Sequence, residues 1–592
     1  MNNKEIIDKK ASNSFTTVLE IYKYLSKKRK LQIIISLILT IIAAVLEIFS
    51  IAIILPFLTL LTNPKSLYDY PIISSFYNFF STYNQNYFII FITFSFILIT
   101  IFSLIVKLYN LRYSIDLGEN IGADLCKDAF EIYLSKSYSF LKSINSSDII
   151  SDINKNIAGS IMAIDSLLKL ISSFVLSLAI IIALLVIDSN ITILTSLILI
   201  SSYLFINKYS KDKLITNSKR IVSLQPLQLK YLQESLGGIR EVILSDLNDY
   251  YTQKFEKVDR KIRSYLANNG FITNSFRYII EAVVLIIICA ITLSFLYLGK
   301  LNSSSFAVLG TFAVGAQKLL PSLQTIFRMW SNIRSKKFEV LKTINILQSY
   351  TKPIKLEHKI INFEKIINLK NISYKFPNAE KYILKNINLQ IKKGECIGVM
   401  GESGSGKSTL ADILMTLLNP TIGEYLIDNC NIYQVDNSEN KVHSWRRSIA
   451  HVPQKIFLAD TTIAENIAFG TDKDKIDMKR LRECANLSSI ESYIESLPMK
   501  YDTNVGESGS FLSGGQIQRM AIARALYKGA KLLIFDEATS ALDEKTEEKI
   551  MNSIKKIKGK VTIIFISHKR KTLEICDEII EIKNGLIRKI KI

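Results

Sequence analysis

Histidine is scarce in this 592-residue sequence, and cysteine is sparse and unpaired. All four histidines lie at or after His358, which excludes a histidine-based metal site or proton relay from the first half of the chain. The six cysteines show no CxxC pairing, so we expect free thiols. The net charge of +21 is not accompanied by a zinc-ligand cluster or an aromatic RNA-binding motif, and we therefore expect no nucleic-acid partner.

Hydrophobic residues are unevenly distributed along the chain. Long runs of Ile, Leu, Phe and Val occur before about residue 330, whereas after about residue 360 apolar residues come in short bursts between Gly, Asp and Lys. We therefore expect a membrane domain over 1–330, a linker over 331–360 and a soluble domain over 361–592. The apolar run after the first 30 residues is too long for a signal peptide, so it predicts a first transmembrane helix.

Six segments are apolar enough to cross a membrane. The sixth is the weakest because polar residues such as Gln317 and Lys318 interrupt it, which suits the interior of a bundle. Lys and Arg concentrate before the first span and in the second and fourth loops, so these loops and both termini should face the cytoplasm. These two long loops are expected to be helices that extend the spans. The expected spans are 31–61, 86–107, 164–187, 190–207, 276–298 and 304–327.

A phosphate-binding motif follows the apolar burst CIGVM in the soluble half. GESGSGKST matches G-x-x-x-x-G-K-[ST] from Gly401 to Ser408, between an expected strand and an expected helix. Its backbone N–H groups should surround a phosphate, Lys407 should reach the β- and γ-phosphates, and Ser408 should bind Mg²⁺. The candidate nucleotide-binding residues are Gly401, Ser403, Gly404, Ser405, Gly406, Lys407, Ser408 and Thr409.

A second apolar burst, KLLIFDEATSALD, ends in two acids. Four apolar residues precede Asp536, which predicts a buried strand that delivers this carboxylate to Mg²⁺. Glu537 is then placed to polarise the attacking water. The alternative is that both acids only cap the next helix. The phosphate-binding motif upstream favours the first interpretation.

The segment FLSGGQIQR carries a family resemblance. LSGGQ at 512–516 resembles the signature of ABC transporter ATP-binding domains, and the other motifs of that family appear in its usual order. The resemblance implies roles for the signature residues Ser513, Gly514, Gly515 and Gln516, for Gln454 (Q-loop, also near Mg²⁺), Asp543 (D-loop) and His568 (γ-phosphate contact). The adenine-stacking aromatic corresponds to Phe376, with Tyr374 as the alternative.

The resemblance also implies how the chain works. Its order of six spans and then an α/β P-loop ATPase domain of ABC type resembles exporters of the bacterial inner membrane, with ATP and Mg²⁺ as cofactors. One phosphate loop and one LSGGQ per chain imply a homodimer, although pairing with a different subunit stays open. Short coupling helices are expected near 134–141 and 225–233.

The transported substrate is the least determined feature. The first Cys is 126 and the first His is 358, so no N-terminal protease domain of a peptide exporter is expected. LEIFSIAIILPFLTLL, with KLLPSLQTI at 318–326, resembles bacterial flippases for lipid-linked oligosaccharides. Export of a peptide or another lipid such as a lipid A precursor, and a non-transporting ATP-dependent regulator, remain alternatives. Glu47, Arg277 and Lys318 are candidate substrate residues, because charged side chains within spans usually face a cavity or a partner.

Overall fold

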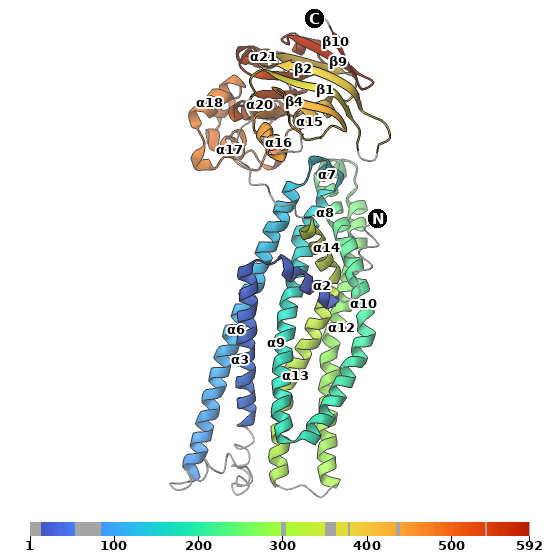
Figure 1. The fold of residues 1–592 in the computed structure, drawn as a ribbon, viewed down its shortest axis with the longest axis vertical. Coiled ribbons are helices and arrows are strands. Elements are labelled where there is room, and N and C mark those ends of the chain that lie inside the picture. Colours follow the sequence, from blue (N-terminus) through green and yellow to red (C-terminus); the bar gives the residue numbers. More distant parts are fainter. Residues whose placement is uncertain are drawn as a thin grey trace. The chain divides into compact units, whose positions relative to one another are not determined.

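The computed structural model describes residues 14–53, 85–297, 303–349, 363–376, 379–433, 438–538 and 542–590. The chain forms two compact units. The first comprises Met1–Lys136 and Phe140–Thr351, and the second comprises Ser137–Ser139 and Lys352–Ile592. Figure 1 shows that the first unit is helical and that the second contains β-sheets.

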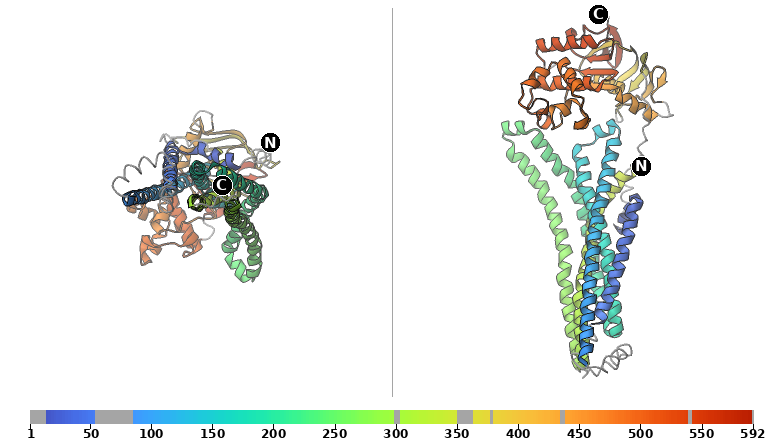
Figure 2. Two further views of the ribbon diagram at one scale, coloured as in Figure 1. Left: turned by 90° about the horizontal axis from the view of Figure 1, so that it is seen from below. Right: turned by 90° about the vertical axis from the view of Figure 1, so that its left-hand side faces the viewer.

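Long helices dominate the first unit. α3 lies beside α6, and α10 lies beside α12, in the views of Figures 1 and 2. α9 and α13 pack against each other. The long helices are α3 (Lys27–Ala52), α6 (Gln85–Ser135), α9 (Ile157–Ile187), α10 (Ser189–Gly237), α12 (Asn248–Tyr297) and α13 (Ser303–Ser335). The shorter ones are α2 (Ser14–Ile21), α7 (Tyr138–Ser143), α8 (Ser146–Ser151), α11 (Ile239–Leu244) and α14 (Lys337–Gln348).

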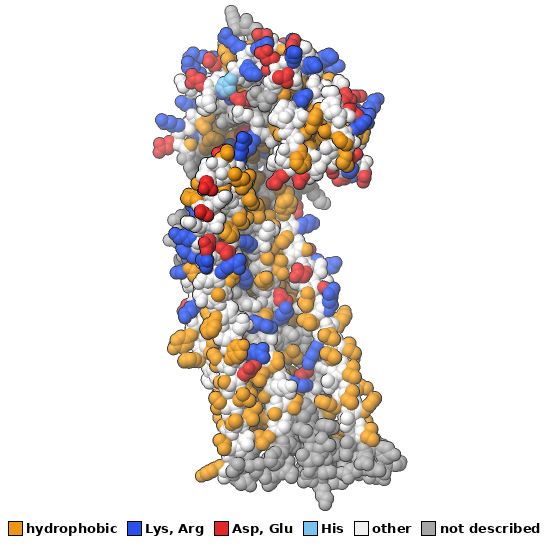
Figure 3. Space-filling model, turned by 180° about the vertical axis from the view of Figure 1, so that it is seen from behind, with side chains coloured by type: hydrophobic (Ala, Val, Ile, Leu, Met, Phe, Trp, Pro, Cys, Tyr) orange, Lys and Arg blue, Asp and Glu red, His pale blue; other side chains and the backbone are white. Residues whose placement is uncertain are grey.

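The six long helices correspond to the six expected spans. Within the described residues, α3, α6, α10, α12 and the segment that contains α8 and α9 are long and apolar enough to cross a membrane. Positions 54–61 of the first expected span lie outside the described residues. In Figure 3, hydrophobic side chains dominate the lower part of the helical unit, while charged side chains gather on its upper part.

The two basic loops are largely helical, as predicted. α6 continues to Ser135, α10 continues to Gly237 and α12 begins at Asn248, so each helix extends well beyond its apolar part. A short helix, α7, overlaps the first expected coupling segment. The second expectation was wrong, because 225–233 lies inside α10 and the short helix there is α11.

The segment expected as a linker is helical in its first part. α13 extends to Ser335, and α14 follows almost directly. Val340, Ile344 and Leu347 on α14 are buried against α2, α6 and α9, which explains why this segment folds as part of the first unit. Residues 350–362 lie outside the described part of the chain.

Two sheets form the framework of the second unit. The antiparallel sheet has the order β2-β1-β4-β5, with β1 (Ile366–Tyr374), β2 (Leu384–Lys392), β4 (Ile422–Ile427) and β5 (Cys430–Asn431). The larger sheet has the order β10-β9-β3-β8-β7-β6 and is parallel from β9 to β6. Its strands are β3 (Cys396–Gly401), β6 (Ile449–Val452), β7 (Leu532–Asp536), β8 (Thr562–Ile566), β9 (Glu578–Lys583) and β10 (Leu586–Ile590).

Helices surround these sheets and also form a separate lobe. α15 (Lys407–Leu414) follows β3, and α21 (Glu544–Ile557) precedes β8. The lobe contains α17 (Ile463–Ile467), α18 (Met478–Leu487), α19 (Glu491–Ser496) and α20 (Gly514–Lys528), and residues such as Ile494 and Met520 form its own core. The remaining helices of this unit are α16 (Ser438–Arg447) and α22 (Arg570–Leu573).

Candidate functional site

Parallel strands bring the predicted catalytic residues to one edge of the larger sheet. β3, β8, β7 and β6 are neighbours in that order, and all run in the same direction. The phosphate loop follows β3, His568 follows β8, Asp536 ends β7, and Gln454 follows β6. Ligands of open α/β sheets bind at the carboxyl ends of such strands. Four motifs that are far apart in the sequence therefore meet at one edge.

The phosphate loop has the backbone shape that an anion requires. Gly404 has a φ of 79°, and a Cβ at this position would meet no atom within 4 Å. Gly406, at the N-terminus of α15, has a φ of 109°. Ser405 Oγ is buried and has no hydrogen-bond partner among the described residues. Left-handed glycines before a helix N-terminus turn N–H groups toward a phosphate, so the loop fits the nucleotide that its sequence predicts.

Lys407 lies buried at the base of this loop. Its Nζ donates hydrogen bonds to the carbonyl oxygens of Gly401 at 2.7 Å and Glu402 at 2.8 Å. Burial lowers the pKa of the Lys407 ammonium, whereas the Glu537 and Asp536 carboxylates act to raise it. Burial, together with the neighbouring Glu537, raises the pKa of Asp536. A phosphate bound here would compensate the positive charge of Lys407, and a divalent cation would compensate the negative charge of Asp536.

Glu537 connects two other predicted catalytic residues. Its Oε2 accepts a hydrogen bond from Gln454 Nε2 at 2.6 Å, and its Oε1 lies 3.1 Å from His568 Nε2. The Glu537 backbone has a φ of 51° and donates its N–H to the Ile566 carbonyl oxygen at 2.9 Å. The structure thus brings these three predicted residues into direct contact.

The oxygen ligands expected for Mg²⁺ lie at the same edge. Ser408 is in the first turn of α15, Asp536 ends β7, and Gln454 touches Glu537, the neighbour of Asp536. Mg²⁺ in nucleotide sites usually takes only one or two protein oxygens and completes its shell with phosphate and water. Ser408, Asp536 and Gln454 are therefore sufficient in number and kind to hold the ion with a bound nucleotide.

The two aromatic candidates for adenine stacking differ in exposure. Tyr374 is 5% exposed and packs in the core, whereas Phe376 is only partly buried at the edge of that core. Their rings meet edge to face, with centroids 5.3 Å apart. A ring in the core cannot receive a base on its face, so the structure favours Phe376 over Tyr374 for this role.

The LSGGQ signature begins α20. Ser513 caps this helix, because its N–H donates to Gln516 Oε1 at 2.8 Å and its Oγ accepts from the Gln516 N–H at 3.4 Å. Ser513 and Gly514 are exposed, and Gly515 is partly exposed. A helix N-terminus that faces outward can bind an anion carried by another molecule. Asp543 caps α21 through the Thr546 N–H at 3.0 Å, while Ser540 of the expected D-loop lies outside the described residues.

Two residues that sequence analysis missed hold α20 in place. Arg524 donates to the Asn466 carbonyl oxygen and to the Phe457 carbonyl oxygen, both at 2.8 Å, and to Asn466 Oδ1 at 3.0 Å. Asn466 is fully buried. These bonds fix the signature helix to the segment that follows Gln454. No periodic or motif signal marks Arg524, because a single arginine on a helix more often reaches solvent.

The three candidate substrate residues fall into two separate groups. Glu47 on α3 is 5% exposed and pairs with Lys318 Nζ on α13 at 3.0 Å and also with Lys107 on α6. Lys318 Nζ donates to Ser50 Oγ at 2.8 Å. Arg277 on α12 is exposed and pairs with Glu281 one turn away at 2.8 Å. Within the described chain, each of these cations is therefore already held by a carboxylate.

Comparison with known proteins agrees with this geometry. Residues 384–540 match the family model described as "ABC transporter", and the second unit is an ABC-type ATP-binding domain. The chain resembles a solved structure of a bacterial Atm1-family ABC exporter with ATP bound, with a TM-score of 0.73 and 20% identity over 95% of each chain. The chain thus has the fold of that exporter structure, with a domain of long apolar helices followed by an α/β ABC-type ATPase domain.

Several curated proteins are similar over part of their length. The ATP-dependent lipid A-core flippase of Ralstonia nicotianae is 29% identical over 360 residues, which is 60% of this chain and 60% of that protein. HepA of Nostoc sp. is 31% identical over 60% of this chain and 57% of its own length. The leukotoxin translocation ATP-binding protein LktB of Mannheimia glucosida is 38% identical over 46% of this chain and 38% of its own length. The chain spans about 60% or less of the length of these curated relatives.

Proposed function

We propose that this protein uses ATP hydrolysis to export or flip an amphipathic, lipid-linked substrate across the bacterial inner membrane, as a homodimer. The observation that carries the proposal is the contact of Glu537 with both Gln454 and His568 beside the phosphate loop. A carboxylate held in this way is positioned to polarise a water molecule, which supports hydrolysis rather than nucleotide binding alone. The exporter fold supports the coupling of that hydrolysis to transport.

Each residue of the ATP site has a distinct task in this proposal. Lys407 and the loop amides bind the phosphates, and Phe376 stacks on adenine. Ser408, Asp536 and Gln454 would hold Mg²⁺, which neutralises phosphate charge when bound. Glu537 polarises the attacking water, and His568 orients the γ-phosphate. Ser513 of the partner subunit completes the site, because the signature is exposed on each chain.

For the substrate, we propose a lipid-linked oligosaccharide. The two stretches that resemble such flippases contact each other, because Lys318 begins the second and pairs with Glu47 and Ser50 of the first. Lys318 and Arg277 would compensate the charge of a pyrophosphate once their carboxylate partners release them. A lipid A precursor fits the apolar helices equally well, and relatives of this chain include proteins named lipid A-core flippases. A peptide substrate is the next alternative, since one relative is named for leukotoxin translocation.

Transport in proteoliposomes tests the proposal directly. Purified protein is reconstituted with a fluorescent lipid-linked oligosaccharide, with a lipid A precursor or with a peptide, and ATP-dependent movement across the bilayer is measured. We expect ATP to drive movement of the oligosaccharide lipid and the substrate to change the ATPase rate, with the Glu537→Gln variant inactive in the same vesicles. If only the lipid A precursor moved, it would take the place of the lipid-linked oligosaccharide as the proposed substrate. ATP turnover without movement of any amphiphile would favour a regulator.

A further inference from the structure

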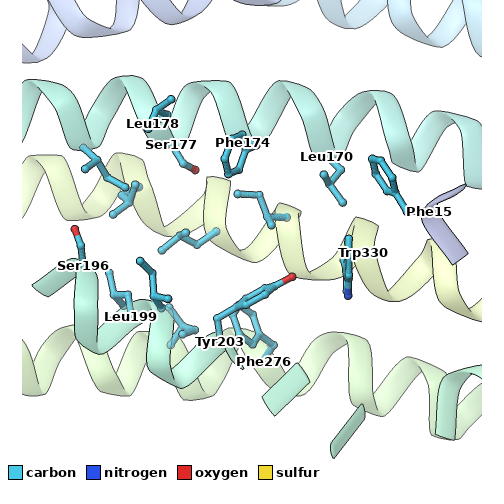
Figure 4. Close-up of a pocket in the computed structure, with 16 residues that line it drawn as sticks. Phe15, Leu170, Phe174, Ser177, Leu178, Ser196, Leu199, Tyr203, Phe276 and Trp330 are labelled. Atoms are coloured by element: carbon cyan, nitrogen blue, oxygen red, sulfur yellow. The ribbon is translucent and has the colours of Figure 1, made fainter. Parts of the chain in front are cut away.

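None of the candidate site residues described so far lines either of two adjoining cavities in the helical unit. The larger has a volume of about 730 Å³, is open on one side, and is lined by residues of α2, α9, α10, α12 and α13. Its walls are almost entirely apolar and include Phe174, Leu178, Leu199 and Phe276 (Figure 4). Ligand pockets usually measure about 300–1,000 Å³ and are mostly apolar. This cavity therefore has the size and the lining of a binding site for an apolar group.

The smaller cavity is polar and shares two aromatic residues with the larger one. It has a volume of about 260 Å³, and Lys211 and Arg334 contribute to its walls. Phe15 and Trp330 line both cavities, and their ring centroids are 6.3 Å apart. In Figure 4, these two side chains mark one end of the apolar cavity, and Tyr203 reaches toward Trp330 from α10. An apolar space and a cationic space thus meet at one aromatic pair.

Arg334 is a buried cation that has no carboxylate partner in the part of the chain that the structure describes. Arg334 is only 7% exposed, and its Nη1 donates a hydrogen bond to Asn207 Oδ1. The guanidinium carbon lies 4.7 Å from the centroid of the Trp330 ring. Among the described residues no carboxylate forms an ion pair with Arg334, although Asp212 acts on it electrostatically from a greater distance. A guanidinium has five N–H donors, and only Asn207 among the described side chains accepts a hydrogen bond from Arg334, so donors are available for a ligand in the cavity.

The charge in this cavity requires compensation. An unpaired buried charge costs several kcal/mol unless a counter-ion or hydrogen bonds replace its lost water. Lys211 adds a second positive charge to the same walls. Arg binds phosphate oxygens through two parallel hydrogen bonds, so a phosphate is the anion that this site would accept best.

We propose that the two cavities together bind one anionic phospholipid of the surrounding membrane. Its acyl chain fills the apolar cavity, and its phosphate lies on Arg334 and Lys211, with Phe15 and Trp330 at the junction. The apolar walls select an amphiphile over a free anion, and the two cations select an anionic headgroup over a zwitterionic one. The headgroup site is distinct from the three candidate substrate residues, because Glu47, Arg277 and Lys318 line neither cavity.

Trp330 provides a direct measurement of this binding. The chain has only two tryptophans, and the other, Trp445, is fully buried in the ATPase domain with hydrogen bonds to Tyr425 and Leu414. The full-length protein is reconstituted in phosphatidylcholine bilayers with increasing fractions of brominated phosphatidylglycerol or brominated phosphatidylcholine. We expect the anionic lipid to quench Trp330 at a several-fold lower fraction than the zwitterionic lipid. Trp445 supplies a constant background, because its indole is shielded in a cytoplasmic domain.

Matched charge deletions locate the headgroup site. Arg334→Gln should abolish the preference for the anionic lipid. Lys211→Gln should reduce this preference. Because Lys211 is exposed, its variant should fold and can be measured even where Arg334→Gln is unstable. Arg328→Gln removes the same charge from the same helix, in a separate cavity that Arg328 shares with Lys169, and should keep the preference. Comparing the two lipids within each variant cancels any change in the brightness of Trp330.

Three results would overturn the proposal. Equal quenching by the two lipids in the unmodified protein would remove the headgroup preference. Equal losses in Arg334→Gln and Arg328→Gln would assign the preference to general surface charge. In detergent without anionic lipid, a saturable change of Trp330 emission with inorganic phosphate would show that the polar cavity is a free-phosphate site. None of these measurements uses ATP or transport, so their failure is distinct from failure of the proposed function.

Discussion

Glu537 has a backbone conformation that few residues other than glycine adopt. Its φ of 51° lies in the left-handed region, which costs about 1–3 kcal/mol and persists only where the surrounding structure enforces it. Here β7 and β8 enforce it through the bond from the Glu537 N–H to the Ile566 carbonyl oxygen. The strained turn directs the carboxylate toward Gln454 and His568. Sequence motifs predicted these three residues, but the strain depends on strand packing and had no signal in the sequence.

Replacing this carboxylate by an amide should stop hydrolysis without stopping nucleotide binding. Glu537→Gln keeps the shape of the side chain but removes the charge that polarises water, while Lys407 and the proposed Mg²⁺ ligands remain. Positioning and electrostatics dominate phosphoryl transfer, so we expect turnover to fall on the order of 10²-fold or more and ATP to trap a closed dimer. Steady-state phosphate release and size-exclusion chromatography with ATP measure both effects.

A second glutamate controls for charge removal in the same region. Glu548→Gln lies on an exposed face of α21 and should turn over ATP at the normal rate. If Glu537→Gln were as active as this control, Glu537 would have no role in polarising water.

His451 should make the ATPase domain sensitive to mild acid. Burial lowers the pKa of His451 to about 4 from an ordinary value of 6.5, and its Nε2 has no hydrogen-bond partner among the described residues. Because the folded protein favours the neutral ring, the stability from His451 is complete above pH 6.5 and is lost as the pH falls toward 4. Linkage gives a loss on the order of 1 kcal/mol by pH 5.5.

Thermal unfolding at two pH values measures this contribution. We expect the melting temperature of the ATPase domain to fall between pH 7.5 and 5.5, and to fall less in His451→Gln, which carries no titrating ring. A variant with the same pH dependence as the unmodified protein would assign the acid sensitivity to other groups.

At the scale of helices, one carboxylate joins three elements of the membrane domain. Glu47 on α3 receives Lys107 from α6 and Lys318 from α13, so its charge is compensated within the helical unit. The sequence left two interpretations for Glu47, exposure to a cavity or pairing with a neighbouring helix. The structure shows the pairing, and it could not be predicted because nothing in the sequence states which helices are neighbours.

Removing the cations proposed to guide phosphate should reduce transport more than ATP hydrolysis. In Lys318→Ala, Glu47 keeps Lys107 as a partner, so the bundle should remain folded. We expect Lys318→Ala combined with Arg277→Ala to lower the rate of substrate flipping while the basal ATPase rate stays nearly normal. Flipping of the lipid-linked substrate and phosphate release are measured in the same proteoliposomes.

A cation outside the spans serves as the reference for this experiment. Lys230 forms an exposed pair with Glu234 on α10, and Lys230→Ala should leave both rates unchanged. Full flipping by the double variant at normal expression would exclude a phosphate-guiding role for Lys318 and Arg277.

The helices themselves were more predictable than their ends. Apolar runs indicated six long helices, and the structure has a helix at each position. The second short helix was misplaced because 225–233 is rich in Gln, Leu and Lys, which are good helix formers, so α10 continues through it despite Pro226. Gly237 and Gly238 end the helix instead. Such boundaries depend on a few residues, whereas a span is set by about 20.

At the scale of the whole molecule, one chain carries one phosphate loop and one signature. The described structure shows the loop completed by its own strands, while Ser513 and Gly514 present the start of α20 to the outside. The resemblance to ABC transporters implied that a second domain supplies the signature for each phosphate loop. A single sequence cannot predict which chain supplies the second signature. The two faces of the interface lie on two separate molecules, and the sequence describes only one of them.

Mixing two inactive variants tests whether ATP is bound between two copies of this chain. Lys407→Ala disables the phosphate loop, and Ser513→Arg blocks the signature, so each variant alone should be inactive. In a mixed dimer with sites formed between chains, one site combines both intact halves, whereas sites formed within a chain would all stay damaged. We therefore expect the isolated mixed dimer to recover activity, up to about half of the normal rate if the two sites act independently. Co-expression with two affinity tags isolates the mixed dimer, and phosphate release from it is compared with that of each variant alone. No recovery in a purified mixed dimer would contradict sites formed between two copies of this chain, and failure to isolate any mixed dimer would favour pairing with a different subunit.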